Sequence, residues 1–336
     1  MKCFLPILLF TIVSCYTATG QKAATVYPIA FYNLENLFDP ADDPNKNDDE
    51  FTPHGFKHYT PDIYQQKLHN LATVIEKLGT DANKEGAALI GVAEIENDKV
   101  LRDLSSQPEI KQRGYRSVWY ESPDLRGIDV ALLYNPTYFT VVSSRSIPAP
   151  FNGADKTRDV LYVSGKLNGE IVHVLVNHWP SRREGKNETA PDRVAVAKVN
   201  KRIADSLLKK DAKARIIIMG DLNDNPTDNS LMQTLNAKAD KLNTAYPYLY
   251  NPWVSIYRMG KGTAAYNDRW DHFDQIIISS GFFNGKLLYK SNEIFDRPFL
   301  KQQSGKYKGY PHRSFSGHRW LNGYSDHLPV LIYLAQ

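Results

Sequence analysis

The chain is long enough for one large domain or two small ones, and its composition excludes several classes of protein. Its 336 residues are 42% hydrophobic and include 20 tyrosines, as expected of a packed globular body. A net charge of +4 is too small for a protein that coats nucleic acid along its whole surface. Any binding of a polyanion must therefore come from a local patch.

The first twenty residues have the pattern of an export leader. Lys2 precedes an apolar stretch, CFLPILLFTIVS, which is too short to span a bilayer, and small residues follow up to Gly20. We expect a signal peptide over residues 1–20 and a secreted or periplasmic protein. The segment Ile12–Cys15 also resembles a bacterial lipobox, and a leader ending before Cys15 would leave a lipoprotein anchored to the cell envelope. The rest of the sequence has no transmembrane segment.

Cysteine chemistry is confined to this leader. Cys3 and Cys15 are the only cysteines, so the mature protein has no disulfide and cannot bind zinc through thiolates. Cleavage after Gly20 removes one lysine and no acidic residue, which lowers the net charge from +4 to +3.

Strand-like runs alternate with two helical segments in the rest of the chain. Thr60-Pro61-Asp62 begins the first helix with a hydroxyl N-cap, a proline at N1 and an acid in the first turn, and Gly79 ends it. The second helix extends from about Pro191 to Lys210, as its apolar spacing indicates.

Other strand-like runs follow one another without a helix between them, and Asn168-Gly169 joins two of them as a type I′ hairpin turn. Hairpins mixed with strand–helix–strand units predict an α/β fold with mixed sheets. No linker or repeat interrupts the pattern, so we expect residues 25–336 to form a single domain. Residues 39–59 and 295–324 are expected to be long functional loops.

Six short polar motifs lie at the ends of the strand-like runs, where loops usually build a functional site on a rigid sheet. In chain order they are Asn33-Leu34-Glu35, Glu94, Asn177-His178-Trp179-Pro180, Asp221-Leu222-Asn223, Asp274 and Ser325-Asp326-His327.

The carboxylates among these motifs are candidates for a metal site. Glu94 ends an otherwise apolar strand, where an unpaired charge is unfavourable, and Glu35 and Asp326 could meet it at one rim. Clustered carboxylates repel one another unless a cation or a proton lies between them, and oxygen ligands suit Mg²⁺, Mn²⁺ or Ca²⁺. The alternative for each acid alone is a helix cap or an arginine partner.

Asp221 and Asn223 point the same way in an extended segment, so the acid could take a proton from water while the amide donates to a phosphoryl oxygen. The alternative is an Asx-turn that leads out of the strand. His178 and His327 are the best catalytic histidines because each has polar neighbours that could fix its tautomer. Five others are expected to be structural or on the surface: His54, His58, His69, His173 and His272.

Basic and aromatic residues alternate in the segment Arg297–Trp320, a pattern that suits a phosphate backbone with stackable bases. The alternative is a solvated loop whose tyrosines pack on the body of the protein.

The ordered motifs resemble the endonuclease/exonuclease/phosphatase superfamily, which includes deoxyribonuclease I, the exonuclease III class and the neutral sphingomyelinases. The resemblance rests on NLEN near the start, followed by GDLND and SDHLP in that order, and it covers nearly all of the mature chain. The motif NHWPSR most resembles that of the secreted bacterial nuclease branch.

This resemblance implies a four-layer α/β sandwich, with two packed mixed sheets flanked by helices and the site at one end. It also implies metal-dependent hydrolysis of a phosphate ester, with Mg²⁺ as the cofactor and Mn²⁺ or Ca²⁺ as alternatives. Glu94 would be the principal metal ligand, and Asn33, Glu35 and Asp326 would lie near the metal. Glu35 departs from the pattern, because many family members have Asp at this place.

The resemblance also implies catalytic roles. Either Asp221 or the Asp274–His327 pair would activate water, while Asn223 and His178 would hold the phosphoryl oxygens and His178 could protonate the leaving oxygen. Four further residues are candidates for substrate binding: Arg126, Asn177, Arg182 and Arg313. Arg182-Arg183 after NHWPS is a departure that puts the leaving-group contacts in doubt.

Three functions are compatible with these motifs. We favour a secreted nuclease that hydrolyses DNA or RNA, acting as a monomer without a stable protein partner. The alternative is a phosphatase or a phospholipase C-type hydrolase, such as a sphingomyelinase-like enzyme or one acting on sugar or inositol phosphates. A binding module without catalysis is the third possibility, but no catalytic position is vacant.

Overall fold

A computed structural model describes residue 1 and residues 24–150, 156–242 and 244–336. The expected leader, with both of its candidate cleavage sites, lies outside the described residues. Among the helices that the structure describes, none has the length and hydrophobicity needed to cross a bilayer.

Two mixed β-sheets form the centre of the protein. The first has the spatial order β14 (Leu288–Ile294), β17 (Val330–Ala335), β1 (Val26–Leu37), β2 (Leu89–Ile95), β4 (Asp129–Tyr134) and β3 (Arg116–Trp119). The second has the order β5 (Phe139–Ile147), β6 (Val160–Leu167), β7 (Glu170–His178), β8 (Ile216–Asp221), β13 (Asp274–Ile278), β10 (Leu249–Tyr250) and β9 (Ala237–Lys238). The pairs β1/β2, β7/β8 and β9/β10 are parallel, and the other neighbouring pairs are antiparallel.

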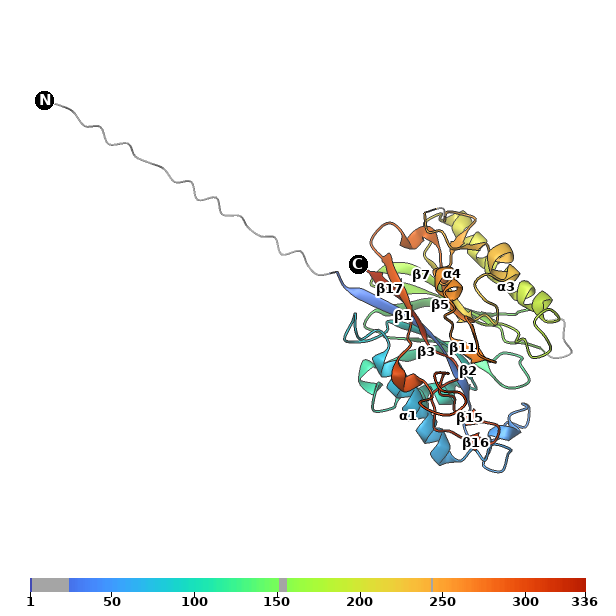
Figure 1. The fold of residues 1–336 in the computed structure, drawn as a ribbon. Coiled ribbons are helices and arrows are strands. Elements are labelled where there is room, and N and C mark those ends of the chain that lie inside the picture. The colour runs from blue at the N-terminus through green and yellow to red at the C-terminus, as the bar shows by residue number, and fades with distance from the viewer. Residues whose placement is uncertain (2–23, 151–155, 243) are drawn as a thin grey trace.

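Alternation of side chains along the first sheet builds two separate apolar layers. In β1, Ile29 and Phe31 belong to the core between the sheets, whereas Ala30 and Tyr32 pack on the other face. That outer face is covered by α1 (Pro61–Lys77) and α2 (Asp98–Ser105) (Figure 1).

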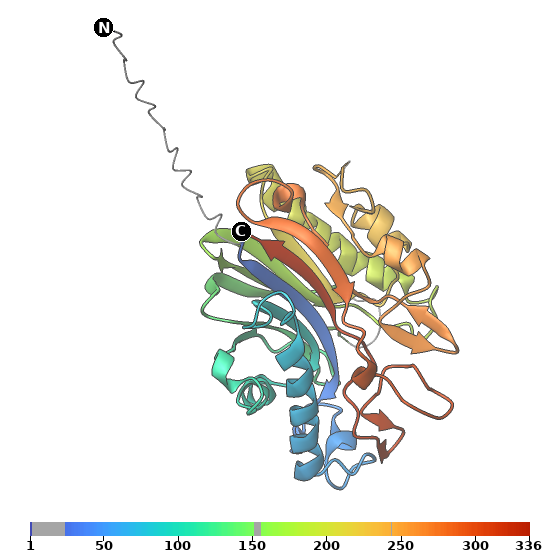
Figure 2. The same cartoon turned by 60° about the vertical axis from the view of Figure 1, so that its left-hand side comes forward.

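The second sheet follows the same rule. Ile217 and Met219 of β8 face the first sheet, and Ile216 and Ile218 pack with α3 (Ala190–Lys210). Figure 2 shows α1 and α3 on opposite sides of the two sheets. Each fully buried aliphatic side chain in these layers contributes roughly 1.5–3 kcal/mol to folding. The predicted fold, two packed mixed sheets with helices outside, is confirmed.

The helices begin where the sequence predicts. The side chain of Thr60 accepts a hydrogen bond from the Ile63 amide at 3.3 Å, so it caps α1 as expected. Asn168 and Gly169 join β6 to β7 with φ angles of 46° and 86°, which confirms the hairpin. The sequence analysis missed α2, a short helix capped by the side chain of Asn97.

Shorter elements lie mainly in the connections. They are the 3₁₀ turns η1 (Asp49–Phe51), η2 (Lys111–Arg113), η4 (Ser280–Phe282) and η5 (Pro298–Leu300), the π-turn η3 (Ser230–Thr234), the helix α4 (Val254–Arg258), and the hairpins β11 (Ala264–Tyr266) with β12 (Arg269–Asp271) and β15 (Phe315–Ser316) with β16 (Arg319–Trp320). The two expected long loops therefore contain local structure: η1 in one, and η5 with the β15–β16 hairpin in the other.

The topology brings the polar motifs to one end of the sandwich. Parallel strands end at the same edge, so Asn33 pairs with Ala93 beside Glu94, and His178 pairs with Asp221. The antiparallel strand β13 begins at this edge, where Asp274 pairs with Asp221. The strand ends that carry the motifs therefore share one corner of the fold.

Candidate active site

Irregular backbone at two strand ends aims the side chains of the site. The register between β1 and β2 shifts between Asn33 and Leu37, and that between β2 and β4 shifts at Glu94. Glu94 has a φ of 61°, a left-handed conformation that is uncommon for a residue with a side chain. The amide of Asn36, also left-handed, donates to Glu94 Oε2 at 2.9 Å. Such bulges re-aim side chains next to functional sites.

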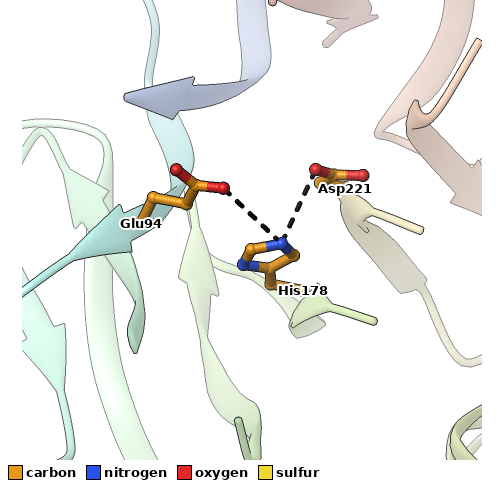
Figure 3. Close-up of side chains that lie close together, drawn as sticks. All are labelled: Glu94, His178 and Asp221. Atoms are coloured by element: carbon orange, nitrogen blue, oxygen red, sulfur yellow. Dashed lines mark ion pairs between the residues drawn. The ribbon is translucent and has the colours of Figure 1, made fainter. Parts of the chain in front are cut away.

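The centre of the site is a cluster of Glu94, His178 and Asp221 (Figure 3). His178 Nε2 lies 3.8 Å from Glu94 Oε1 and 3.7 Å from Asp221 Oδ2. The Asn33 amide bridges the same two acids, donating to Glu94 Oε1 at 3.3 Å and to Asp221 Oδ2 at 3.1 Å. One neutral amide and one imidazole therefore separate two carboxylates.

A second cluster shares Asp221 with the first. His327 Nδ1 lies 2.7 Å from Asp274 Oδ2, and His327 Nε2 lies 3.9 Å from Asp221 Oδ2. Ser325 Oγ supports the loop by accepting from the His327 amide at 3.1 Å and donating to the Asn33 carbonyl at 2.7 Å. Asp274 therefore fixes one ring nitrogen and leaves the other facing Asp221, as the sequence predicted for a paired acid and histidine.

The electrostatic environment shifts the pKa values of the two histidines in opposite directions. Burial, with the cations Arg158 and Arg126 nearby, lowers the pKa of His178 well below its ordinary value, so His178 is neutral. Burial also opposes charge on His327, but attraction from Asp274 and Asp221 outweighs it and raises the pKa of His327 well above its ordinary value. Burial raises the pKa of Asp221 to about 7, although the charge of His327 opposes this shift.

The donor set fits a divalent cation. Two groups bring their ligand atoms within 4.8 Å of one another: Glu94, His178 and Asp221, and Asp221, Asp274 and His327. Among the described residues, no lysine or arginine lies within 4 Å of either Glu94 or Asp221; the basic side chains at that range are the neutral His178, near both acids, and His327, near Asp221 alone. Neighbouring carboxylates without a cationic partner are the arrangement that a bound cation stabilises.

A cavity of about 370 Å³ opens onto these residues. Glu94, His327 and Asp326 line it together with three basic residues, Lys57, Arg126 and Arg183. Arg126 therefore lies where the sequence analysis placed it, at a surface that can receive a phosphate. Lys57 and Arg183 were not among the candidates.

Glu35 has different contacts from those expected of a metal neighbour. Its carboxylate accepts hydrogen bonds from the backbone amides of Ser314, at 2.7 Å, and Phe315, at 3.5 Å. Burial, together with repulsion from Asp326, raises the pKa of Glu35 to about 7. In this geometry Glu35 anchors the loop between β14 and β17 and does not join either ligand cluster.

The ammonium group of Lys67, a residue that the sequence analysis missed, supports the same loop. It is buried on α1 and donates to the Glu35 carbonyl and to Ser314 Oγ, the latter at 2.9 Å. Its position three residues after Tyr64 and four before Leu71 places it on the apolar stripe, a signal that could have indicated burial.

Arg182, which the sequence predicts to bind substrate, contacts other residues of the protein. Its guanidinium donates to the Asn223 carbonyl at 2.7 Å, to Asp224 at 3.0 Å and to Asp228 at 2.6 Å. It also lies over the ring of Phe273, at 4.7 Å from the centroid. Its donors are thus engaged within the protein, and the neighbouring Arg183 lines the cavity instead.

Asn177 also has a structural environment rather than the predicted contact with substrate. It is fully buried, and its Oδ1 accepts from Trp179 Nε1 at 3.1 Å and from Asn200 Nδ2 at 2.7 Å. Arg158, another residue that the sequence analysis missed, is ion-paired with Asp124 at 2.9 Å and donates to the Trp179 carbonyl at 2.7 Å. These contacts fix the strand end that carries His178.

The remaining predicted residues lie around the clusters. Asn223 donates from its side chain to the Trp179 carbonyl at 3.0 Å, and its backbone amide donates to Asp221 Oδ1 at 3.1 Å, so the alternative of an Asx-turn is correct here. Arg313 pairs with Asp326 at 2.8 Å. None of the five histidines expected to be structural belongs to either ligand cluster in the described part of the chain.

Comparison with known proteins identifies the family. The model of the endonuclease/exonuclease/phosphatase family matches residues 28–336, and the chain belongs to this family. It is a hydrolase with a candidate metal site formed by Glu94, His178, Asp221, Asp274 and His327. No curated protein matches the sequence.

Solved structures share the fold at low identity. A structure of TDP2 from C. elegans is 14% identical, with 95% of this chain and 78% of that chain covered and a TM-score of 0.55. TDP2 from D. rerio, complexed with single strand DNA product, is 13% identical (92% and 99% covered, TM-score 0.54). A family protein from Bacteroides thetaiotaomicron is 15% identical (93% and 98% covered, TM-score 0.54). At this identity the similarity shows the fold alone.

We predict that Asp274 and His327 act as one unit. Asp274→Asn and His327→Ala should each lower kcat/KM on bis(4-nitrophenyl) phosphate by roughly 100-fold or more, because each breaks the oriented acid–imidazole pair. The double variant should lose little beyond the worse single variant. His69→Ala, an exposed histidine, is the control. Multiplicative losses in the double variant would show that the two residues act independently.

Alanine variants of the neighbouring residues Arg182 and Arg183 can distinguish a residue that positions Asn223 from a residue that binds substrate. Arg182→Ala should lower kcat several-fold with little change in KM, because it releases the Asn223 carbonyl without removing a substrate contact. Arg183→Ala should instead raise KM for a polyanionic substrate and reduce its salt dependence. The measurement is steady-state kinetics at two ionic strengths. The opposite pattern would restore Arg182 as the residue that binds substrate.

Proposed function

We propose that the protein is a secreted, metal-dependent nuclease that hydrolyses phosphodiester bonds of nucleic acid. The observation that carries this proposal is the composition of the 370 Å³ cavity, which is lined by the carboxylates of Glu94 and Asp326, by Arg126 and Arg183, and by Lys57, which is paired with Glu50 at 3.3 Å. Acids that can hold a cation, surrounded by bases that attract phosphate, suit hydrolysis of a phosphate ester.

Mg²⁺ is the metal we favour. Glu94 would hold it, with Asp326 on the same cavity wall, and carboxylate oxygens are the ligands that Mg²⁺ prefers; Mn²⁺ and Ca²⁺ share this preference. When bound, such a cation neutralises phosphate charge and stabilises the departing alkoxide. The proposed cation also accounts for the half-buried Glu94 and the buried Asp221, which lack a lysine or arginine partner within 4 Å among the described residues.

The side chains at the centre supply the proton chemistry. Asp221, with a pKa raised to about 7 by burial, can accept a proton from an attacking water near neutral pH. His327 faces Asp221 through Nε2 while Asp274 holds Nδ1, and as an imidazolium it can return a proton but can take one from water only after losing its own. We therefore propose Asp221 as the general base, with the neutral form of His327 as the alternative. Neutral His178 can donate from Nε2 to a phosphoryl oxygen between the two carboxylates.

Several observations support a polynucleotide as substrate. The three bases around the cavity and the basic, aromatic segment Arg297–Trp320 suit a polyanion with stackable bases. The D. rerio TDP2 structure of similar fold was determined with a single strand DNA product. The leader-like residues 1–20 support export from the cytoplasm, and we propose that residues 25–336 act as one monomeric domain.

A substrate panel tests this function. Metal-stripped protein should be inactive on plasmid DNA, RNA, sphingomyelin and bis(4-nitrophenyl) phosphate, and Mg²⁺ or Mn²⁺ should restore hydrolysis of nucleic acid. Glu94→Gln keeps the shape but removes a ligand charge, so activity should fall by orders of magnitude while the melting temperature of the metal-free protein is retained.

The exposed acid of α1 provides the control, since Glu76→Gln makes the same chemical change far from the cavity and should leave activity unaltered. Full activity in excess EDTA would exclude the metal mechanism. Hydrolysis of sphingomyelin without hydrolysis of either nucleic acid would favour the phospholipase alternative.

A further inference from the structure

A second cavity, of about 620 Å³, adjoins the catalytic cavity, and Asp326 lines both. We propose that this second cavity binds one unpaired nucleotide of the substrate strand, next to the phosphate that is cleaved. The inference rests on the nucleic-acid function proposed above. Its volume is within the range of pockets that enclose a small organic ligand.

One wall of the second cavity is attached directly to the catalytic dyad. Ala264 of β11 pairs with His327, and the Leu328 amide donates to the Thr263 carbonyl at 2.8 Å. The amide of Asp274 donates to Thr263 Oγ1 at 3.3 Å. The hairpin β11–β12 then carries Tyr266, which is 75% exposed and lines the cavity. A ligand against this hairpin therefore lies at a fixed place relative to the reacting phosphate.

The opposite wall is a closed loop that holds two more tyrosines. The Gln302 amide donates to the Tyr310 carbonyl at 2.9 Å, and the Gly309 amide donates back to the Gln302 carbonyl at 2.9 Å. The rings of Tyr307 and Tyr310 lie 5.6 Å apart, and Tyr307 is 46% exposed. Aromatic rings that are held in place and left open to solvent are the platforms on which unpaired bases stack.

A hydrogen-bonded contact joins the two walls. Tyr310 donates its hydroxyl to Asp268 Oδ1 at 2.7 Å and accepts from the Asp268 amide at 2.6 Å. Asn267 and Asp268 form the left-handed tip of the hairpin, with φ angles of 47° and 57°. Tyr310 is thus fixed with respect to the tip of the hairpin, which reduces the entropy lost when a planar ring binds beside it.

The charges around the cavity favour a phosphate over a choline headgroup. Lys306 and Arg319 line it, and among the described residues neither has a carboxylate within 4 Å. Arg313, the third base, is already paired with Asp326. Of the two acids that also line the cavity, Asp326 is paired with Arg313 and Asp268 accepts from the Tyr310 hydroxyl, so the two cations without acidic partners favour a phosphodiester over the quaternary ammonium of sphingomyelin. Stacking on a ring also requires an exposed base face, which a paired base inside a duplex does not offer.

Abasic substitution in a single-stranded oligothymidylate provides the test. For the wild type, an abasic residue at the position next to the cleaved bond should lower kcat/KM about tenfold, the loss expected for one stacked base. Tyr307→Ala should lower kcat/KM on the intact oligonucleotide by a similar factor relative to bis(4-nitrophenyl) phosphate, and Tyr307→Phe should retain most of it. On the abasic substrate, Tyr307→Ala should add little, because the interaction is already absent.

A charge variant completes the design. Lys306→Ala combined with Arg319→Ala should flatten the salt dependence on the oligonucleotide, whereas Lys290→Ala, at an exposed lysine of β14 that lines neither cavity, should leave activity and salt dependence as in the wild type.

Five outcomes would overturn the assignment. Wild-type insensitivity to abasic residues, multiplicative losses on the abasic substrate, or an equal loss on bis(4-nitrophenyl) phosphate would each show that Tyr307 does not stack on a base. Loss of sphingomyelin hydrolysis in Tyr307→Ala would place a lipid in the cavity. If the wild type hydrolyses bis(4-nitrophenyl) phosphate but no nucleic acid, the proposed function fails before any variant is made, and this inference fails with it.

Discussion

The structure depends on the repulsion among carboxylates that are buried together at one end of the two sheets. Desolvated charges of one sign are costly by several kcal/mol each unless they are paired. The charge of Asp274 is compensated by the His327 imidazolium, and burial raises the pKa of Asp221 to about 7. Glu94 has only amides and a neutral imidazole as close partners, so its charge is the one that a metal would satisfy. The apolar layer between the sheets keeps these side chains from moving apart.

The arginines behind the site keep their charge away from these acids. Arg158 is paired with Asp124 and Arg182 with Asp224 and Asp228, and each also donates to a backbone carbonyl, of Trp179 and Asn223 respectively. An arginine placed directly on Glu94 would compete with a cation for the same oxygens. Because these arginines are paired with other acids, their hydrogen bonds instead stabilise the strand ends beside His178 and Asp221. The metal site keeps its negative charge.

The sequence predicted the features that arise from local patterns. Strand ends, caps and the Asn168-Gly169 turn are set by neighbouring residues, so an α/β fold with mixed sheets could be foreseen from them. The two packed sheets and the shared site of Glu94, Asp221 and His327 followed from the family resemblance instead. The roles of buried polar side chains could not, because their partners are distant in the chain: Glu35 meets Ser314 279 residues later. Their positions in polar motifs made Asn177 and Arg182 candidates for substrate binding. Only tertiary contacts distinguish a side chain that binds substrate from one that supports the backbone.

The same limit explains why the basic segment near the C-terminus could be noticed and yet not interpreted from sequence. Alternating lysines and tyrosines fit both a solvated loop and a binding surface, and the difference depends on what lies opposite. The hairpin β11–β12, some 40 residues earlier in the chain, supplies that opposite wall through the contact between Asp268 and Tyr310. Because Ala264 on this hairpin pairs with His327, and Asp326 lines both cavities, the segment that would hold the substrate strand and the residues that would cleave it are parts of one hydrogen-bonded unit. Changes in the loops can therefore alter which strand is held, while the sheet ends that carry Glu94 and Asp221 keep the chemistry constant.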